Sequence, residues 1–231
     1  AGLPPAVRTA AAQIATARGR AGAWVIANTR SSVEPFLTYA DRRDLRERVW
    51  RMFVTRGESG GATDTRETIT AILGLRAEKA RLLGYPTYAH WQLEQAMART
   101  PERASALMEA VWPAAVERVR EEVADMQAIA DRDGAGIRVE PWDYRYYAEK
   151  VRRERYDLDE TAITPYLQLE HLREGMFHMA GELFGFAFTP ADPAQVPTYH
   201  PDVRAWAVHR RDGSLAGLWY FDPYARPGKR S

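Results

Sequence analysis

The five histidines are the side chains of this 231-residue chain best suited to bind a metal or transfer a proton. They are His90, His171, His178, His200 and His209. A zinc helix of the HExxH type needs two histidines four positions apart, which share a helix face, and a glutamate directly after the first. No two of the five stand four apart, and none precedes a glutamate. Since cysteine is also absent, we predict neither a catalytic nor a thiolate metal site in this chain.

A helix predicted over residues 165–184 carries the best remaining metal candidate. Four polar side chains share one of its faces: His171, Glu174, His178 and Glu182. Beside them runs an apolar stripe: Leu172, Met176, Met179 and Leu183. The two histidines lie about 10 Å apart along the axis, too far to share an ion held at ~2.1 Å from each. Glu174 and His178 alone supply only two ligands, so we interpret this face as a solvated polar flank.

His200 has a carboxylate, Asp202, two residues away. An imidazole oriented by a carboxylate is a general-base arrangement, but no serine, cysteine or metal is placed to use it. We therefore predict a structural turn, in which Asp202 bonds local backbone and the His200 ring packs.

The C-terminal residues predict a β-hairpin. Residues 203–209 and 215–222 are rich in β-branched and aromatic side chains, and Asp212-Gly213 between them is a strong turn signal. Pro223, Pro227 and Gly228 follow. Because proline lacks the N–H that a central strand needs, the chain must turn away or run along an edge, and an exposed edge can pair with an extended peptide.

Most of the remaining chain is helical in pattern. Asp64 caps a predicted helix of about five turns, ending near Gly84. Thr100 and Pro101 begin a longer helix that ends near residue 133 and reaches roughly 45 to 50 Å. Long helices of this kind suggest the wall of a cleft.

A further helix is predicted over residues 143–155. Its aromatic side chains share one face, and Glu149 can form charge pairs with Arg145, Arg152 and Arg153. We interpret this segment as packing rather than as a surface for stacking nucleic-acid bases.

We expect a mainly α fold with long packed helices and a small antiparallel β-sheet near the C-terminus. The helical pattern ends at Gly185, so we divide the chain into a helical segment, 1–185, and a β-hairpin region, 186–231, that is incomplete at its C-terminal end.

Charge and hydropathy narrow the function classes. The 32 basic and 31 acidic residues give a net charge of +1, which provides no attraction for nucleic acid. No run approaches the ~20 apolar residues needed to span a bilayer, and the N-terminus lacks a signal-peptide pattern. We expect a cytoplasmic protein that does not bind membranes.

Six short segments together resemble one enzyme family. They are residues 36–41 (FLTYAD), 55–57 (TRG), 82–91 (LLGYPTYAHW), 142–150 (WDYRYYAEK), 199–204 (YHPDVR) and 224–231 (YARPGKRS). In order and spacing they are similar to the thimet-oligopeptidase family of zinc metallopeptidases, of the peptidyl-dipeptidase and oligopeptidase A type. The resemblance covers the whole chain.

The resemblance implies a two-lobed enzyme that hydrolyses short, extended peptides. In the complete enzyme, a zinc-activated water assisted by the HExxH glutamate attacks the peptide carbonyl. It further implies that Tyr224, Arg226, Lys229 and Arg230 border the substrate channel, where the cationic side chains attract a peptide carboxylate. The other interpretation is that these basic residues only solubilise a turn.

The missing HExxH motif sets the functional prediction for this chain. We expect it to be inactive alone, and to act with a C-terminal catalytic part of the same protein. The alternative is a non-catalytic helical module that binds peptides or serves as a scaffold. Dipeptide release and internal cleavage by the complete enzyme are both compatible with the resemblance.

Overall fold

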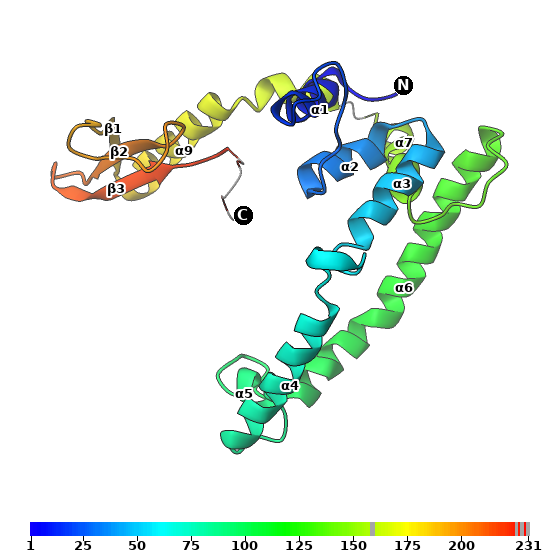
Figure 1. Ribbon diagram of the computed structural model, residues 1–231. Helices are drawn as coiled ribbons and strands as arrows, with labels where there is room; N and C mark the ends of the chain where they lie inside the picture. The colour runs from blue at the N-terminus through cyan, green and yellow to red at the C-terminus, as the bar shows by residue number, and fades with distance from the viewer. Residues whose placement is uncertain (158–159, 225, 227–228, 230–231) are drawn as a thin grey trace. The chain divides into compact units, whose positions relative to one another are not determined.

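The computed structural model describes residues 1–157, 160–224, 226 and 229 of the chain. The fold is mainly helical with a small antiparallel sheet near the C-terminus, which confirms the predicted fold class (Figure 1). Two compact units make up the chain, residues 1–158 and residues 159–231. Among the described helices, none is both long and apolar enough to cross a lipid bilayer.

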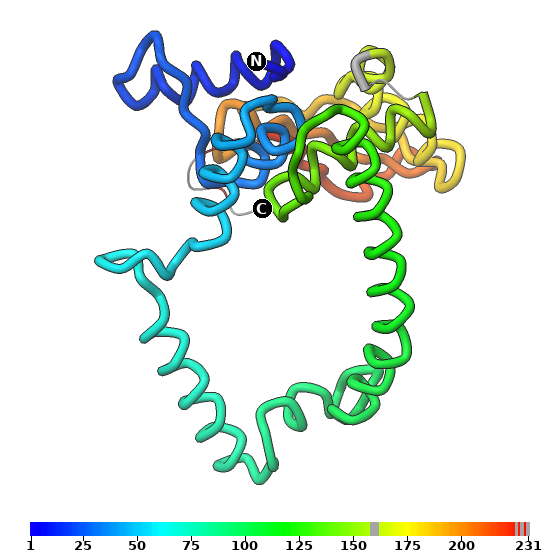
Figure 2. Tube along the Cα trace, turned by 90° about the vertical axis from the view of Figure 1, so that its right-hand side faces the viewer, coloured from blue at the N-terminus to red at the C-terminus, as the bar shows by residue number. Residues whose placement is uncertain are grey.

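The first unit is built from helices. In chain order they are α1 (Pro5–Ala17), α2 (Arg30–Tyr39), α3 (Arg43–Val54), the 3₁₀ turn η1 (Gly61–Thr63), α4 (Arg66–Leu82), α5 (Tyr88–Leu93), α6 (Pro101–Arg132) and α7 (Tyr144–Tyr156). α2 contacts α3 and α7, and α6 contacts α7. Figure 2 follows the chain out along α4, through α5 and back along α6.

Both long helices begin where the sequence predicts. The N–H of Arg66, the first residue of α4, donates to the Asp64 carboxylate at 3.0 Å. The hydroxyl of Thr100, just before α6, accepts the N–H of Arg103 at 3.3 Å. The 32 residues of α6 correspond to about 48 Å. In the described residues α4 and α6 do not contact each other. The two helices therefore do not form together the cleft wall that their length suggested.

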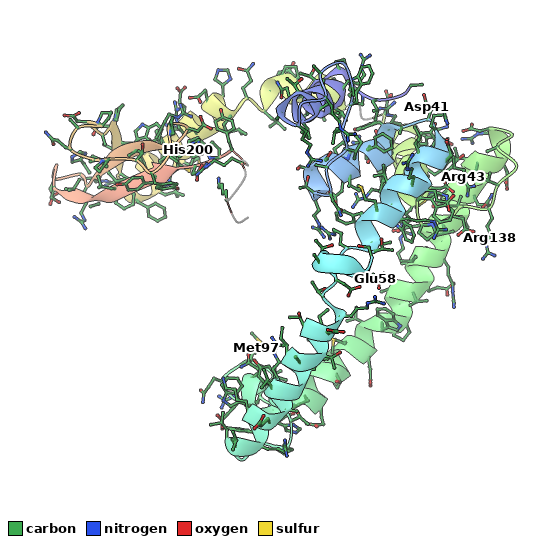
Figure 3. All side chains as sticks on the ribbon, viewed as in Figure 1. Asp41, Arg43, Glu58, Met97, Arg138 and His200 are labelled. Atoms are coloured by element: carbon green, nitrogen blue, oxygen red, sulfur yellow. The ribbon has the colours of Figure 1, made fainter. Side chains whose placement is uncertain are left out.

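A buried ion cluster joins α3 to the start of α7. Asp143 is fully buried and accepts a hydrogen bond from Arg46 Nη2 at 2.8 Å and one from Arg43 Nε at 3.0 Å (Arg43 is labelled in Figure 3). Arg46 is 2% exposed and also donates to the Ala40 carbonyl at 2.7 Å. Because Arg46 and Asp143 stand 97 residues apart, the cluster ties distant parts of the chain into one core.

The charge pairs expected in α7 form only in part. Glu149 binds both Arg152 and Arg153 at 2.8 Å, as predicted. Arg145 instead binds Glu34 at 2.8 Å, because α2 packs against α7 and brings that carboxylate within reach. Tyr147, on the predicted packing face, is buried with residues of α6.

The second unit holds one long helix and the sheet. Its elements are α8 (Glu160–Ile163), the 3₁₀ turn η2 (Thr164–Tyr166), α9 (Leu169–Phe184), β1 (Ala187–Pro190), β2 (Arg204–His209) and β3 (Leu215–Phe221). α9 begins four residues later than predicted, because Gln168 is extended and residues 164–166 form a separate turn.

The strands pair in the order β1-β2-β3, and both pairings are antiparallel. The predicted hairpin is confirmed as β2 and β3. Its turn is closed by the Arg210 N–H donating to the Ser214 carbonyl at 2.9 Å, with Gly213 at a φ of 80°. β1 was not predicted. It has four residues and ends on Pro190, which an edge strand tolerates.

An aromatic cluster fixes α9 against the sheet. The Phe177 ring stacks on Phe188 with centroids 4.1 Å apart, and meets Trp206 and Trp219 edge-on at 5.6 and 5.4 Å. α9 ends at Gly185, whose φ of 70° is the left-handed conformation that glycine adopts without strain.

The apolar stripe singled out from the sequence is not the one that packs on the sheet. Leu172, Met176, Met179 and Leu183 are 42 to 65% exposed. α9 therefore has apolar side chains on two sides, and the stripe that includes Phe177 contacts the sheet. The compact units separate at 158, whereas the predicted division at 185 marks the change from helix to strand; as a domain boundary that division stays a prediction.

Candidate functional site

The histidines do not come together as a metal site. Within the described residues, no three histidine, aspartate or glutamate side chains form a group that could hold a metal ion. His171 and His178 are exposed on α9, and His90 contacts the Thr87 hydroxyl at 2.8 Å. The zinc that the resemblance implies does not fit these side chains.

His200 takes part in a local turn, as the sequence predicts. Its Nδ1 accepts the backbone N–H of Asp202 at 3.1 Å and lies 3.6 Å from that residue's carboxylate (His200 is labelled in Figure 3). The ring thus accepts the bond that was expected to go to the Asp202 side chain. The Val203 N–H also donates to the His200 carbonyl, at 3.0 Å, so these residues form a turn directly before β2.

β3 presents the feature of the sheet most suited to binding a peptide. It pairs with β2 on one side, and no described strand pairs with its other side. Trp219 and Phe221 turn toward the aromatic cluster. Because side chains alternate along a strand, Tyr220 projects from the opposite face. The outer edge of β3 therefore offers backbone hydrogen-bonding groups next to an aromatic side chain.

A cluster of polar side chains lies at the C-terminal end of β3. We call it the Asp222 cluster; it comprises Asp222, Tyr199, Arg226 and Lys229. Arg226 donates from both Nη groups to the Asp222 carboxylate, at 2.6 and 2.9 Å. The Tyr199 hydroxyl donates to the same carboxylate at 3.0 Å. Lys229 Nζ lies 3.1 Å from it and also donates to the Asp222 and Tyr224 carbonyls.

These contacts stabilise the ionised form of Asp222. The two hydrogen bonds from Arg226 hold the pKa of the carboxyl far below its ordinary value of 3.8, although partial burial opposes the shift. The lysine and the tyrosine act in the same direction as Arg226. The carboxylate is therefore charged throughout the physiological range.

The structure places the predicted substrate-binding residues as follows. Tyr224 is half exposed, and Arg226 and Lys229 are brought together on Asp222. Arg230, like Pro227 and Gly228, lies outside the described residues. The anion that Arg226 and Lys229 contact is a carboxylate of the chain itself, and two cations against one carboxylate leave a surplus of one positive charge.

Asp222 was missed in the sequence reasoning. The signal that could have found it is the spacing: an aspartate at the end of a predicted strand, four residues before an arginine. That carboxylate can bond the arginine if the chain turns tightly at Pro223.

A cavity of about 580 Å³ lies between α9, β2 and the loop before β2. Its charged side chains are already paired with one another. Arg204 donates to both carboxylate oxygens of Glu170, at 2.7 and 3.1 Å, and Arg173 also pairs with Glu170. Arg204 lowers the pKa of Glu170 through these bonds. We assign this network to fastening α9 to β2.

Comparison with known proteins places these features in a family context. The family model described as "Peptidase family M3" matches residues 36–231. The chain is 40% identical to the dipeptidyl carboxypeptidase of Escherichia coli K12 over 220 residues, which cover 95% of this chain and 32% of that protein. It is 35% identical to the organellar oligopeptidase A of Arabidopsis thaliana, over 99% of this chain and 30% of that protein.

A third relative is the oligopeptidase A of Escherichia coli K12, which is 30% identical over the full chain and 34% of its own length. The chain therefore spans about a third of the length of the curated relatives that it matches.

Proposed function

The chain belongs to peptidase family M3, and on that premise we propose that it forms the peptide-binding part of a zinc-dependent oligopeptidase that hydrolyses short, extended peptides. The observation that carries the proposal is the edge of β3 with which no described strand pairs, followed directly by the cationic Asp222 cluster. An extended peptide added to such an edge gains main-chain hydrogen bonds that do not depend on its sequence. Broad tolerance of peptide sequence follows.

The positive charge of the Asp222 cluster supports a role near a peptide carboxylate. Arg226 and Lys229 both already contact the Asp222 carboxylate. We therefore propose that their surplus charge attracts a peptide carboxylate over a longer distance, without forming a new bidentate salt bridge. Tyr224 and Arg230 complete the border of the channel in this proposal. The resemblance is what supports this role for both residues.

The zinc ligands of the active protein lie, in this proposal, outside residues 1–231. The relatives are peptidases by name and about three times as long as this chain, and the sequence contains no HExxH pair. The isolated chain is therefore proposed to bind no catalytic zinc and to hydrolyse no peptide. The cytoplasmic location expected from the sequence remains part of the same proposal.

Exposed apolar faces on α6 and α9 support the proposal that another part of the protein packs against this chain. Leu107, Met108, Val111 and Trp112 of α6 are 59 to 70% exposed. A helix that is apolar on the side facing solvent normally packs against another element. We propose that the catalytic part of the same protein covers this face and the exposed stripe of α9.

The alternative, a non-catalytic peptide-binding or scaffold module, shares the edge of β3 with the first proposal. The matches to named peptidases favour the first. The natural coding sequence separates the two. If it continues past residue 231 into an HExxH motif, the extended protein should bind one zinc per chain and hydrolyse short peptides. A stop codon directly after residue 231 would favour the binding module.

A further inference from the structure

We propose that Tyr199 and Tyr220 form a side-chain pocket beside β3 that selects peptides carrying a bulky apolar residue, with Asp222 as the residue that positions its wall. The inference rests on the proposed function, because it concerns which side chain is preferred in a peptide that pairs with β3. It adds selectivity to an edge that otherwise recognises only backbone.

The pocket is open and has a volume of about 490 Å³. It is lined by Pro197, Thr198, Tyr199 and Tyr220. The two tyrosines are 70% and 42% exposed, which leaves their rings available to a ligand. Among these lining residues none is charged, so the walls consist of aromatic rings, a proline ring and a threonine.

Tyr220 connects this pocket to the edge of the sheet. It belongs to β3 and projects from the face opposite Trp219, which packs against Phe177. A peptide strand added to β3 would lie about 5 Å away, with its side chains alternating between the two faces. One side chain of the peptide would therefore stand next to the Tyr220 ring, within the pocket.

The opposite wall is held in place by Asp222. The Tyr199 hydroxyl donates to the Asp222 carboxylate at 3.0 Å, and the Arg226 guanidinium lies 5.9 Å from the centre of the Tyr199 ring. Tyr199 comes from the loop before β2, and this bond ties its ring to the residue that directly follows β3. Asp222 acts through Tyr199 and does not itself line the pocket.

The chemistry of the walls indicates the residue that fits. Aromatic rings and proline favour apolar side chains, and aromatic pairs gain further from edge-to-face contact. A cationic side chain would find no partner among the lining residues. The favoured ligand is an extended peptide with phenylalanine, leucine or a similar side chain opposite Tyr220.

The test measures the affinity of the ¹⁵N-labelled 231-residue chain for two probes by NMR titration. The probes are acetyl-Ala-Ala-Phe-Ala-Ala-amide and acetyl-Ala-Ala-Ala-Ala-Ala-amide, whose blocked ends exclude any effect of a terminal carboxylate. We expect the phenylalanine peptide to bind roughly five- to tenfold more tightly, as partial burial of one aromatic side chain allows. The amide resonances of β3 should shift with both peptides.

The variants distinguish the pocket from its surroundings. Tyr220→Ala should reduce the preference for the phenylalanine peptide to about onefold, because it removes the ring that the phenylalanine side chain would contact. Tyr199→Phe keeps the ring but removes the bond to Asp222, and should reduce the preference in part. Tyr166→Ala, an exposed tyrosine of the same unit outside the pocket, should preserve it. Dispersed amide resonances show that each variant is folded.

Two results would overturn the proposal in different ways. If both peptides shift β3 but Tyr220→Ala keeps the full preference, the pocket is wrong and peptide binding at the edge stands. If neither peptide shifts β3, the proposed edge fails and the pocket fails with it.

Discussion

Arg226 directs both of its Nη groups at the carboxylate of Asp222, at 2.6 and 2.9 Å. Two residues expected to meet a peptide carboxylate, Arg226 and Lys229, therefore already bind one within the chain. The interaction holds Arg226 and Lys229 against the residue that directly follows β3. It also leaves a single surplus positive charge in the Asp222 cluster.

Asp222→Asn should loosen the segment after β3. The amide side chain keeps the shape but loses the charge that holds Arg226 and Lys229, so the heteronuclear NOE of their backbone amides should fall. Asp212→Asn, in the turn between β2 and β3, is the matched control and should leave both values unchanged. Unchanged values in Asp222→Asn would show that the carboxylate does not order this segment.

The Asp222 cluster should also resist mild acid. Because the pKa of Asp222 is lowered in the folded chain, its contribution is fully present above the ordinary value of 3.8 and is lost only as the pH falls through the lowered, folded value. The NOE values of Arg226 and Lys229 should thus be the same at pH 7 and at about pH 3, where a carboxyl group with the ordinary pKa would be mostly protonated. A fall between these two pH values would mean that Asp222 titrates normally.

Asp143→Ala should destabilise the first unit strongly. It would leave Arg46 buried without its carboxylate, and breaking one partner of a buried pair costs roughly 3 to 5 kcal/mol. Urea unfolding followed by circular dichroism measures the loss. Asp44→Ala, which removes the partner of the exposed Arg42, should have no measurable effect. Equal effects from the two substitutions would contradict the role given to the buried cluster.

Phe177→Ala should remove most of the packing between α9 and the sheet. Truncation of a core phenylalanine costs roughly 3 kcal/mol or more, and the near-UV signal of Trp206 and Trp219 should weaken with it. Leu183→Ala, on the exposed stripe of the same helix, should change neither stability nor signal in the isolated chain. A larger loss of stability from Leu183→Ala than from Phe177→Ala would mean that α9 packs through the other stripe.

The exposed face of α6 should cause the isolated chain to self-associate. Trp112→Glu places a charge in the centre of that face and should shift the chain toward monomer in sedimentation velocity. Trp24→Glu, at an equally exposed tryptophan in another part of the first unit, should not. A chain that is monomeric without substitution would contradict the proposal that this face needs a partner.

Local signals in the sequence predicted α4, α6, α7 and the β2–β3 hairpin, because each is bounded by a capping residue or a turn residue next to a periodic apolar pattern. β1 escaped prediction since four residues ending in proline carry too little pattern. The sequence does not show which side of α9 meets the sheet, because that helix has apolar residues on two sides and only tertiary contacts distinguish them.

The candidate site was predicted less completely than the fold. The sequence located the cationic segment at residues 224–230. It did not show that Arg226 and Lys229 have an acidic partner, because Asp222 was interpreted only as the end of a strand. Arg145 shows the same difficulty: its partner, Glu34, stands 111 residues away. Ion pairs across such distances depend on packing that a single sequence does not reveal.

The central claim is that this chain supplies a peptide-binding edge but no catalytic centre. The direct measurement incubates the purified 231-residue chain with equimolar zinc and an internally quenched peptide, and records bound zinc, hydrolysis and NMR shifts together. The account predicts shifts in β3, no stoichiometric zinc and no hydrolysis above a zinc-only blank. One tightly bound zinc per chain, with turnover that a chelator abolishes, would contradict it.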